Sequence, residues 1–301
     1  MSSAAPETFR AGFACLLGRP NTGKSTLTNA LVGTKIAITS DRPQTTRHAI
    51  RGIVSRPDGQ LVLVDTPGFH RPRTLLGERL NDLVRATVAE VDVVVFCVPA
   101  TDKIGPGDRF IVEQLQAIAG RTPAIAVVTK CDAAGKNLVG ERLLEVADLA
   151  DWDEVVPVSA VEGYQVGLLA DLLLARLPYG HPLYPDDELT DAPEAVMVAE
   201  LVREAALSGV RDELPHSIAV VVEELVRTDR RIDIHAVMYV ERDSQKGIVI
   251  GTGGERLRSV GTAARRQIEA LLGAQVYLDL RVKVAKDWQR DPKQLNRLGF
   301  S

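Results

Sequence analysis

Apolar runs of four to eight residues alternate with amphipathic stretches through the first 178 residues of the chain. Runs of this length are typical of strands buried in a parallel sheet, and the stretches between them place apolar residues at helical spacing. The alternation predicts an α/β fold, a doubly wound and mostly parallel sheet with helices on both faces. The expected strands are Ala11–Leu17, Gln60–Val64, Val91–Val98, Ala124–Thr129 and Glu154–Pro157, with an added strand Ile50–Ser55 pairing with Gln60–Val64, and the expected helices are Ser25–Leu31, Gly77–Glu90, Asp108–Ile118, Leu138–Asp148 and Val166–Leu177.

The pattern changes after residue 178. Pro178–Asp187 contains three prolines and a glycine, a composition typical of a linker. The remainder predicts a small α+β domain of order α-β-β-α-α-β, in which helices cover one face of a three-stranded sheet. The expected domains are therefore residues 1–178, a linker at 179–188 and residues 189–301. In the second domain, helices are expected at Ala192–Leu207 and Glu255–Leu272, and strands at Ser217–Arg227, Ile232–Arg242 and Gln275–Ala285.

Composition places the chain among ordinary globular proteins, because apolar residues make up 45% and charged residues 25% of its 301 positions. The three cysteines, Cys15, Cys97 and Cys131, lie in or beside apolar runs. So sparse and odd a set is not a disulfide framework or a four-thiolate zinc site, and core packing is expected instead. No apolar run approaches the roughly 20 residues of a membrane span, and no signal-peptide pattern is seen, so a reduced, cytoplasmic monomer is expected.

Charged residues are unevenly distributed, although the net charge is only −4. Residues 188–241 contain 5 basic and 12 acidic side chains, whereas residues 242–301 contain 12 basic and 6 acidic ones. The C-terminal end is therefore cationic, which is typical of a solvated face or of a surface that contacts phosphates. Trp288 lies in this basic tail, before an expected helix at Pro292–Leu298, where it could stack on an unpaired base or cover the sheet.

The clearest motif is a glycine-rich turn between the first strand and the first helix. Residues 18–25 read G-R-P-N-T-G-K-S and match the phosphate-loop pattern G-x-x-x-x-G-K-S in the required strand–helix context. Backbone N–H groups of such a loop surround the phosphates of a nucleotide, and the helix N-terminus adds a partial positive charge. The expected nucleotide-binding residues here are Gly18, Asn21, Thr22, Gly23, Lys24, Ser25 and Thr26, with Lys24 on the β and γ phosphates and Ser25 on Mg²⁺.

A second motif, Asp65-Thr66-Pro67-Gly68, closes the strand Gln60–Val64. An aspartate at the carboxyl end of a strand beside a phosphate loop can hold Mg²⁺, usually through water. The Gly68 N–H is placed to contact the γ phosphate. A strand-ending turn of this kind is common by itself. Its occurrence together with a phosphate loop is what indicates a role in binding Mg²⁺ and phosphate.

Two further fragments follow buried strands and indicate guanine as the base. Thr129-Lys130-Cys131-Asp132 follows one strand, and Ser159-Ala160 follows the next. The Asp132 carboxylate can accept hydrogen bonds from the N1–H and exocyclic amine of guanine, an arrangement that adenine does not present. Lys130 would lie along the base plane, and the Ala160 N–H would meet the guanine O6.

Together these residues resemble the translation-factor-related GTPases, and the whole chain resembles the Era family among them. The resemblance includes Pro43-Gln44-Thr45-Thr46-Arg47 in the first switch, a C-terminal part similar to a type II KH module, and the ending Leu298-Gly299-Phe300. It implies a GTPase that uses GTP, GDP and Mg²⁺, binds 16S rRNA near its 3′ end and assists maturation of the 30S subunit. It also implies catalytic positions at Asn21, Lys24, Thr46 and Gly68 and magnesium ligands at Ser25, Thr46 and Asp65, with Thr45 the alternative to Thr46 because the doublet leaves the register open.

The chain departs from the family pattern at two places. Thr129 stands where the family usually has Asn, whose amide links the base-binding loop to the phosphate loop. The shorter Thr is expected to weaken this link and with it nucleotide affinity. The KH turn G-x-x-G usually carries a basic residue between its glycines, but here it holds Thr252 and Gly253. Backbone N–H groups would then carry the RNA phosphates, so the expected RNA-binding residues are Gly251, Thr252, Gly253, Gly254, Arg256 and Arg258.

Hydrolysis is expected to be slow. Phe69 follows Gly68, at the place where Ras-like enzymes have a glutamine that orients the attacking water, and a phenyl ring cannot do this. Phe69 could equally pack inward as core. In related potassium-activated GTPases an asparagine at the position of Asn21 helps to hold a monovalent cation, so the resemblance implies K⁺ as a possible further cofactor.

The sequence therefore predicts a GTP-hydrolysing switch joined to a reader of single-stranded RNA, with no DNA partner. A membrane-surface GTPase is the alternative, because cationic charge does not distinguish RNA phosphates from lipid phosphates, and it would place the protein peripherally on the inner face of the cell membrane. An ATP-dependent small-molecule kinase is a third hypothesis. The fragments at 129–132 and 159–160 argue against it.

Overall fold

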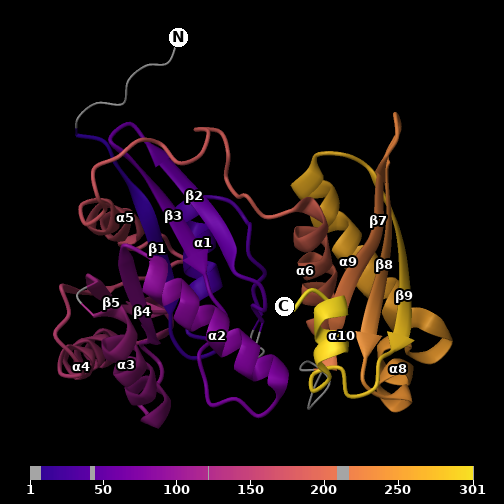
Figure 1. The fold of residues 1–301 in the computed structure, drawn as a ribbon, viewed down its shortest axis with the longest axis horizontal. Helices are drawn as coiled ribbons and strands as arrows, with labels where there is room; N and C mark the ends of the chain where they lie inside the picture. The colour runs from indigo at the N-terminus through magenta and orange to yellow at the C-terminus, as the bar shows by residue number, and fades with distance from the viewer. Residues whose placement is uncertain (1–7, 41–44, 121, 209–216, 301) are drawn as a thin grey trace. The chain divides into compact units, whose positions relative to one another are not determined.

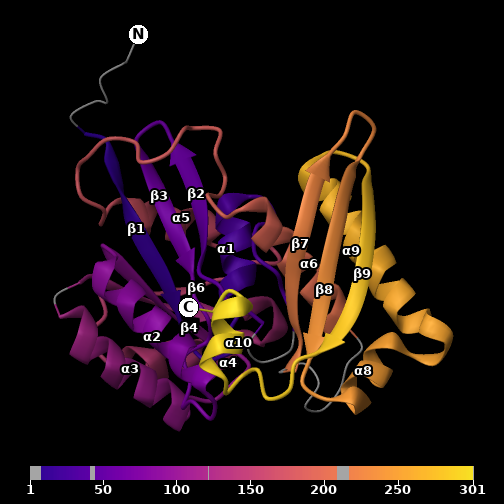
Figure 2. The same ribbon diagram turned by 45° about the vertical axis from the view of Figure 1, so that its right-hand side comes forward.

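The structure, a computed structural model, describes residues 8–40, 45–120, 122–208 and 217–300. The chain forms two compact units, each with its own sheet (Figures 1 and 2). The first unit comprises residues 1–37, 46–71 and 80–191, and the second comprises residues 38–45, 72–79 and 192–301. The inclusion of 38–45 and 72–79 in the second unit is a feature that the sequence pattern does not indicate.

The first unit is built on a six-stranded sheet of order β2-β3-β1-β4-β5-β6. Neighbouring strands are parallel except β2, which runs antiparallel to β3. The doubly wound, mostly parallel sheet predicted from the sequence is thus confirmed. Its strands are β1 (Arg10–Leu17), β2 (Ile50–Arg56), β3 (Gly59–Asp65), β4 (Val93–Pro99), β5 (Ala124–Thr129) and β6 (Glu154–Pro157).

Helices cover both faces of this sheet. Alternate strand residues point to opposite faces, so the two faces form two separate apolar cores. Helices α1 and α5 pack on the face that includes Leu16 and Val95, and α2, α3 and α4 pack on the face that includes Leu17 and Phe96. The helices are α1 (Lys24–Val32), α2 (Leu75–Glu90), α3 (Pro106–Ala119), α4 (Lys136–Ala147) and α5 (Val166–Leu174).

The proline-rich segment after α5 packs on the first unit. Its backbone pairs with β1, since the Ala11 N–H donates to Pro178 O at 3.1 Å. The side chain of Gln60, which is fully buried in β3, accepts hydrogen bonds from the N–H groups of Leu183 and Tyr184 at 2.7 and 2.9 Å. The Ile53 N–H of edge strand β2 donates to Leu189 O at 2.9 Å, so the segment also covers part of an exposed sheet edge. The predicted linker is therefore held along the sheet and is not a free tether.

The second unit has a three-stranded sheet of order β7-β8-β9, with β7 antiparallel and β9 parallel to β8. Helices α6 and α9 lie on one face (Figure 1), where Val198, Val202 and Ile268 form a core with β8. The described residues thus confirm the order α-β-β-α-α-β. The elements are α6 (Glu194–Leu207), β7 (Ala219–Arg227), β8 (Ile232–Val240), α8 (Asp243–Ile250), α9 (Glu255–Leu272), β9 (Val276–Val284) and α10 (Pro292–Arg297).

The segment 38–45 joins this core through Ile38, which is buried. Its Thr39 N–H donates to the Glu204 carboxylate of α6 at 2.8 Å. The preceding residue of α6, Arg203, is buried, forms an ion pair with Glu200 and donates to the carbonyl of Thr45. These contacts tie Thr39 and Thr45 to α6, and the buried charge of Arg203 is paired with Glu200.

The C-terminal tail packs as part of the second unit. Trp288 is fully buried, stacks on Phe300 with ring centroids 5.7 Å apart, and donates from Nε1 to Ser217 O at 3.0 Å. Of the two roles considered from the sequence, covering the core is the one observed, because a ring with no exposed surface cannot receive a base. Among the described residues, no helix is long and apolar enough to cross a membrane.

The cysteines are held as core thiols in the first unit. Cys15 and Cys97 are completely buried, and burial raises the pKa of each thiol to about 12. Cys131 is only partly buried, with its Sγ 3.1 Å from Val128 O, and burial raises its pKa as well.

Because the thiolate is the nucleophile that attacks a disulfide reagent, the buried thiols of Cys15 and Cys97 should resist modification in the folded protein. We expect Ellman's reagent at pH 8 to modify at most one thiol per chain, Cys131, and all three after unfolding in guanidinium chloride. Cys131→Ser should abolish the native reaction. Rapid modification of two or more thiols in the folded protein would contradict this placement.

Candidate functional site

The candidate site lies where the parallel strands β1, β3 and β5 end. The carboxyl ends of parallel strands meet at one edge of a sheet, which is the usual place for ligands in open α/β sheets. The phosphate loop follows β1, Asp65 is the last residue of β3, and Thr129 is the last residue of β5. The topology therefore brings together three motifs that are far apart in the sequence.

Lys24 is the first residue of α1, and only 6% of its surface is exposed. Its Nζ donates to Gly18 O at 3.2 Å and to Arg19 O at 2.8 Å, so the ammonium lies inside the turn of the phosphate loop. Burial lowers the pKa of Lys24, and the negative charge of Asp65 acts in the opposite direction. A cation enclosed by backbone groups at a helix N-terminus suits an anionic ligand such as a phosphate.

Three oxygen side chains converge beside the loop. Ser25 Oγ donates to Asp65 Oδ2 at 2.6 Å, and Thr46 Oγ1 lies 2.9 Å from Ser25 Oγ and 3.4 Å from Asp65 Oδ2. Asp65 and Thr46 are buried. Hydroxyl and carboxylate oxygens are the ligands that Mg²⁺ prefers, so this set of donors fits the ion.

The same geometry distinguishes the two threonines of the doublet. Thr46 Oγ1 reaches Ser25 and Asp65, whereas Thr45 Oγ1 contacts the carbonyl of Ser40 at 3.4 Å. The structure therefore places Thr46, and not Thr45, beside the other candidate magnesium ligands. Pro43 and Gln44, which contribute to the family resemblance, lie outside the described residues.

Gly68 lies tightly against the phosphate loop. A Cβ at this position would come within 2.6 Å of Pro20 N, so only glycine allows the approach. The following N–H, that of Phe69, donates to Gly18 O at 3.1 Å. The Phe69 side chain is 2% exposed and lies in the core with α2 and α3, so it packs inward.

The loop after β5 is tied directly to the phosphate loop. Thr129 is 4% exposed, and its Oγ1 donates to Thr22 O at 2.6 Å, while Lys130 Nζ donates to Asn21 O at 2.8 Å. Thr129 thus makes the link despite its shorter side chain, and the expected reduction of nucleotide affinity stays a prediction. The two loops approach closely enough for a hydroxyl to replace the longer amide.

Asp132 is oriented by the segment that follows β6. Ser159 Oγ donates to Asp132 Oδ1 at 2.6 Å and accepts from the Glu162 N–H at 3.1 Å. Ser159 is 1% exposed whereas Asp132 is exposed, so this hydrogen bond joins a buried hydroxyl to a carboxylate at the surface, and the half-buried Ala160 follows in the same turn. The predicted base-binding residues Lys130, Asp132 and Ala160 are thus on neighbouring loops at one edge of the sheet.

Sequence reasoning missed the role of Arg19. Its Nε donates to Asp108 Oδ1 at 2.7 Å, and Asp108 is completely buried at the start of α3. Arg19 occupies a variable position of the phosphate-loop pattern, and its partner is 89 residues away. The pattern therefore contains no signal for this anchor, which ties the loop to the rest of the unit.

The candidate RNA-binding turn lies in the second unit, between α8 and α9. Gly251, Gly253 and Gly254 have φ values of 71°, 57° and 77°, a left-handed backbone that favours glycine. Thr252 and Gly253 are exposed, and the exposed Arg258 donates to the carbonyl of Gly253.

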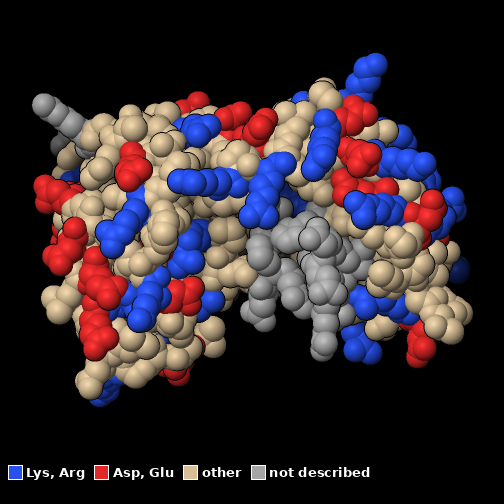
Figure 3. All heavy atoms as spheres, turned by 90° about the horizontal axis from the view of Figure 1, so that it is seen from below, with Lys and Arg blue, Asp and Glu red and all other residues tan. Residues whose placement is uncertain are grey.

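Arg256, which is expected to help bind RNA phosphates together with Arg258, also contacts the end of α6. Its Nη2 donates to Ala206 O at 3.4 Å and to Ser208 O at 3.2 Å, at the end of α6, where terminal carbonyls attract a cation. Basic side chains are also present on other surfaces, and Figure 3 shows them interspersed with acidic ones. Contact of the turn, Arg256 and Arg258 with a phosphate chain stays a prediction.

The contribution of the Thr129 hydroxyl to nucleotide binding can be tested by an isosteric substitution. Thr129→Val leaves the buried carbonyl of Thr22 without its donor, which costs about 1 kcal/mol, so GDP should bind about fivefold more weakly. Titration with a fluorescent GDP analogue measures the effect, and Thr129→Ser, which keeps the hydroxyl, is the matched control. Equal affinity of the Val variant and the parent would show that the loop is held by other contacts.

Comparison with known proteins gives matches to both units. Residues 13–130 match the family described as 50S ribosome-binding GTPase, and residues 213–289 match the KH domain family. The chain is 68% identical to the GTPase Era of Mycobacterium avium, covering 97% of this chain and 99% of that protein. It is 64% identical to the GTPase Era of Streptomyces coelicolor, covering 98% of this chain and 96% of that protein.

Solved structures of Era proteins also match this chain over nearly its whole length. A crystal structure of Era in complex with MgGDPNP and nucleotides 1506–1542 of 16S ribosomal RNA matches with a TM-score of 0.90 and 35% identity, covering 97% of this chain and 99% of that one. A variant of Aquifex aeolicus Era bound to GDP and AlF4⁻ matches with a TM-score of 0.91 at the same identity and coverage. The chain belongs to the Era family of GTPases.

Proposed function

We propose that this protein is a GTP-hydrolysing switch that binds single-stranded 16S rRNA near its 3′ end and assists maturation of the 30S ribosomal subunit. The observation that carries the proposal is that one chain contains both the phosphate loop with its oxygen cluster and the exposed glycine turn of a KH domain. In this proposal residues 1–178 bind and hydrolyse GTP, residues 179–188 join the domains, and residues 189–301 bind RNA.

The nucleotide-binding role uses residues that already contact one another. Lys24 neutralises phosphate charge, and the N–H groups of residues 18–26 surround the phosphates. Ser25, Thr46 and Asp65 would hold Mg²⁺, either directly or through water, and the ion would neutralise charge on the phosphates. Lys130 and Ala160 contact the base.

For hydrolysis, this chain contributes position and charge. The buried Phe69 side chain cannot orient water, so the Gly68 N–H and Lys24 are the groups placed to stabilise charge on the γ phosphate. K⁺ as an activating cation beside Asn21 stays a prediction. A faster turnover in K⁺ than in Na⁺, abolished by Asn21→Ala, is the result that would support it.

The RNA-binding role rests on the turn at 251–254. KH domains clamp a short single-stranded segment with such a turn, because glycines let the sugar-phosphate chain approach the backbone. The related Era structure contains nucleotides 1506–1542 of 16S rRNA, which is the basis for proposing this RNA region here. Peripheral contact with the cell membrane, considered from the sequence, stays a prediction that liposome flotation would test.

Guanine selectivity should depend on Asp132. Asp132→Asn replaces one acceptor oxygen with a donor NH₂, so GTP should bind at least tenfold more weakly, and xanthosine triphosphate, whose extra oxygen can accept from the amide, should bind better than GTP. Competition between the two nucleotides measures the preference. Glu162→Gln, a similar change on an exposed neighbour, should leave it unaltered. An unchanged GTP preference in the Asn variant would refute the assignment.

RNA binding should depend on the glycine turn. Replacing Thr252 and Gly253 with Asp places two negative charges against the RNA phosphates, so binding of a short unpaired RNA should fall more than a hundredfold, as judged by gel shift. GTP hydrolysis without RNA should change little, because the phosphate loop lies in the other unit.

The matched control adds the same charge to exposed positions of α9, as Ala263→Asp with Ala270→Asp. Its RNA affinity should decrease much less than that of the turn variant. If both double variants lose affinity equally, RNA binding depends on the overall charge of this unit and not on the turn.

A further inference from the structure

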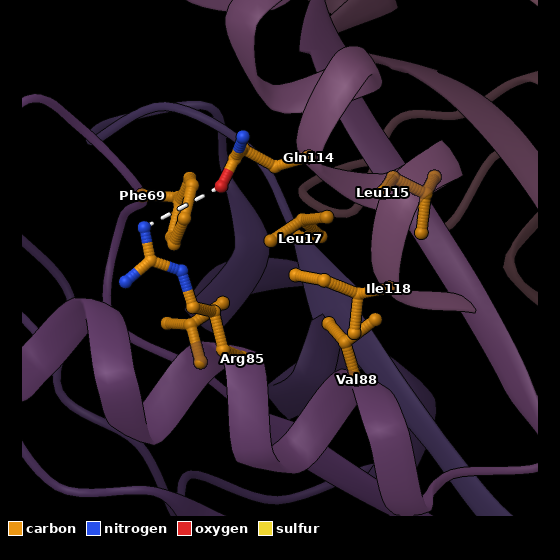
Figure 4. Close-up of a pocket in the computed structure, with 8 residues that line it drawn as sticks. Leu17, Phe69, Arg85, Val88, Gln114, Leu115 and Ile118 are labelled. Atoms are coloured by element: carbon orange, nitrogen blue, oxygen red, sulfur yellow. Dashed lines mark hydrogen bonds between the residues drawn. The ribbon is translucent and has the colours of Figure 1, made fainter. Parts of the chain in front are cut away.

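The side chain of Phe69 occupies one end of a small apolar pocket between α2 and α3 (Figure 4). Its other lining residues include Leu17, Val88 and Leu115, and its free space is no larger than about one water molecule. The ring is therefore closely packed, and the contacts that the neighbouring helices make with it set its orientation.

One aromatic contact and one cation–π contact restrict the Phe69 ring. Phe110 of α3 stacks on Phe69 with centroids 5.7 Å apart and an interplanar angle of 13°. The guanidinium carbon of Arg85, on α2, lies 5.6 Å from the centre of the Phe69 ring, within the range of a cation–π interaction.

Arg85 also links the two helices that line the pocket. Its Nη1 donates to Asp82 Oδ1 at 3.0 Å, and its Nη2 is 3.4 Å from Gln114 Oε1 on α3 (Figure 4). The second of these hydrogen bonds is long and therefore weak. Arg85 is thus aligned mainly by Asp82, and its main effect on Phe69 comes from its position over the ring.

Phe69 connects the apolar core to the phosphate loop. Phe69 is joined to the phosphate loop through its N–H, which donates to Gly18 O at 3.1 Å. Gly68 lies so close to Pro20 that no Cβ fits between them. Residues 68 and 69 are therefore held by the phosphate loop through their backbone and by the α2–α3 core through the Phe69 ring.

We propose that Arg85 is a positioning residue for GTP hydrolysis: its guanidinium holds the Phe69 ring in the α2–α3 pocket and so keeps the Gly68 N–H directed at the γ phosphate. This inference rests on the proposed function. It assigns the Phe69 ring the role of anchoring the backbone that carries the Gly68 N–H. In Ras-like enzymes a glutamine at this position instead orients the attacking water.

Single-turnover GTP hydrolysis tests the proposal. Arg85→Ala removes a cation–π contact worth about 0.5–1 kcal/mol, so hydrolysis should slow about three- to fivefold, while GDP affinity should stay within twofold of the parent. Arg85→Lys keeps a cation over the ring and should restore more than half of the lost rate. Arg109→Ala, which removes an exposed arginine of α3, is the matched control and should hydrolyse GTP at the parental rate.

A double-mutant cycle separates this role from general stabilisation. Phe69→Leu fills the pocket without an aromatic ring, so adding Arg85→Ala to it should slow hydrolysis no further. An additive effect in the double variant would overturn the proposal, as would an unchanged rate in Arg85→Ala or an equal loss of GDP affinity. Failure of the parent protein itself to hydrolyse GTP would instead refute the proposed function.

Discussion

The nucleotide site depends on the parallel pairing of β1 with β3 and of β4 with β1 and β5, because that pairing brings the carboxyl ends of the strands to one edge. The loops at this edge are then joined by short hydrogen bonds. The Thr129–Thr22 and Ser159–Asp132 hydrogen bonds are each 2.6 Å long, the first buried and the second partly buried. A buried hydrogen bond is costly to break once its partner is left unsatisfied, so these contacts keep the loops in one arrangement.

Lys24 and Asp65 are buried at this edge of the sheet, so neighbouring protein groups and not solvent compensate their charges. Burial lowers the pKa of Lys24, and both the carbonyls of Gly18 and Arg19 and the charge of Asp65 favour its protonated form. Asp65 in turn accepts from the Ser25 hydroxyl. A site in which oxygens surround a cation is suited to exchange those contacts for phosphate and a metal ion without reorganising the fold.

In the second unit, the candidate site is a turn of the backbone and not a cluster of buried side chains. Its glycine turn has no basic residue between the glycines, and Arg256 is directed to the carbonyl end of α6. The exposed turn and Arg258 remain at its surface. Segment 38–45 and the C-terminal tail add to the core of this unit, so residues distant in sequence contribute to a domain whose sheet has only three strands.

Local patterns in the sequence determined most of the architecture. Strand and helix periodicity, the phosphate-loop spacing and the position of Asp65 at the end of a strand each depend on neighbours within a few residues. The tertiary structure alone decided that Thr46 and not Thr45 meets Ser25, that Thr129 reaches Thr22, and that Phe69 and Trp288 point into cores. It also paired Arg19 with Asp108 and directed Arg256 to α6. These contacts and orientations depend on how the helices and strands pack against one another. The residues involved are far apart in the chain, so no short sequence pattern encodes them.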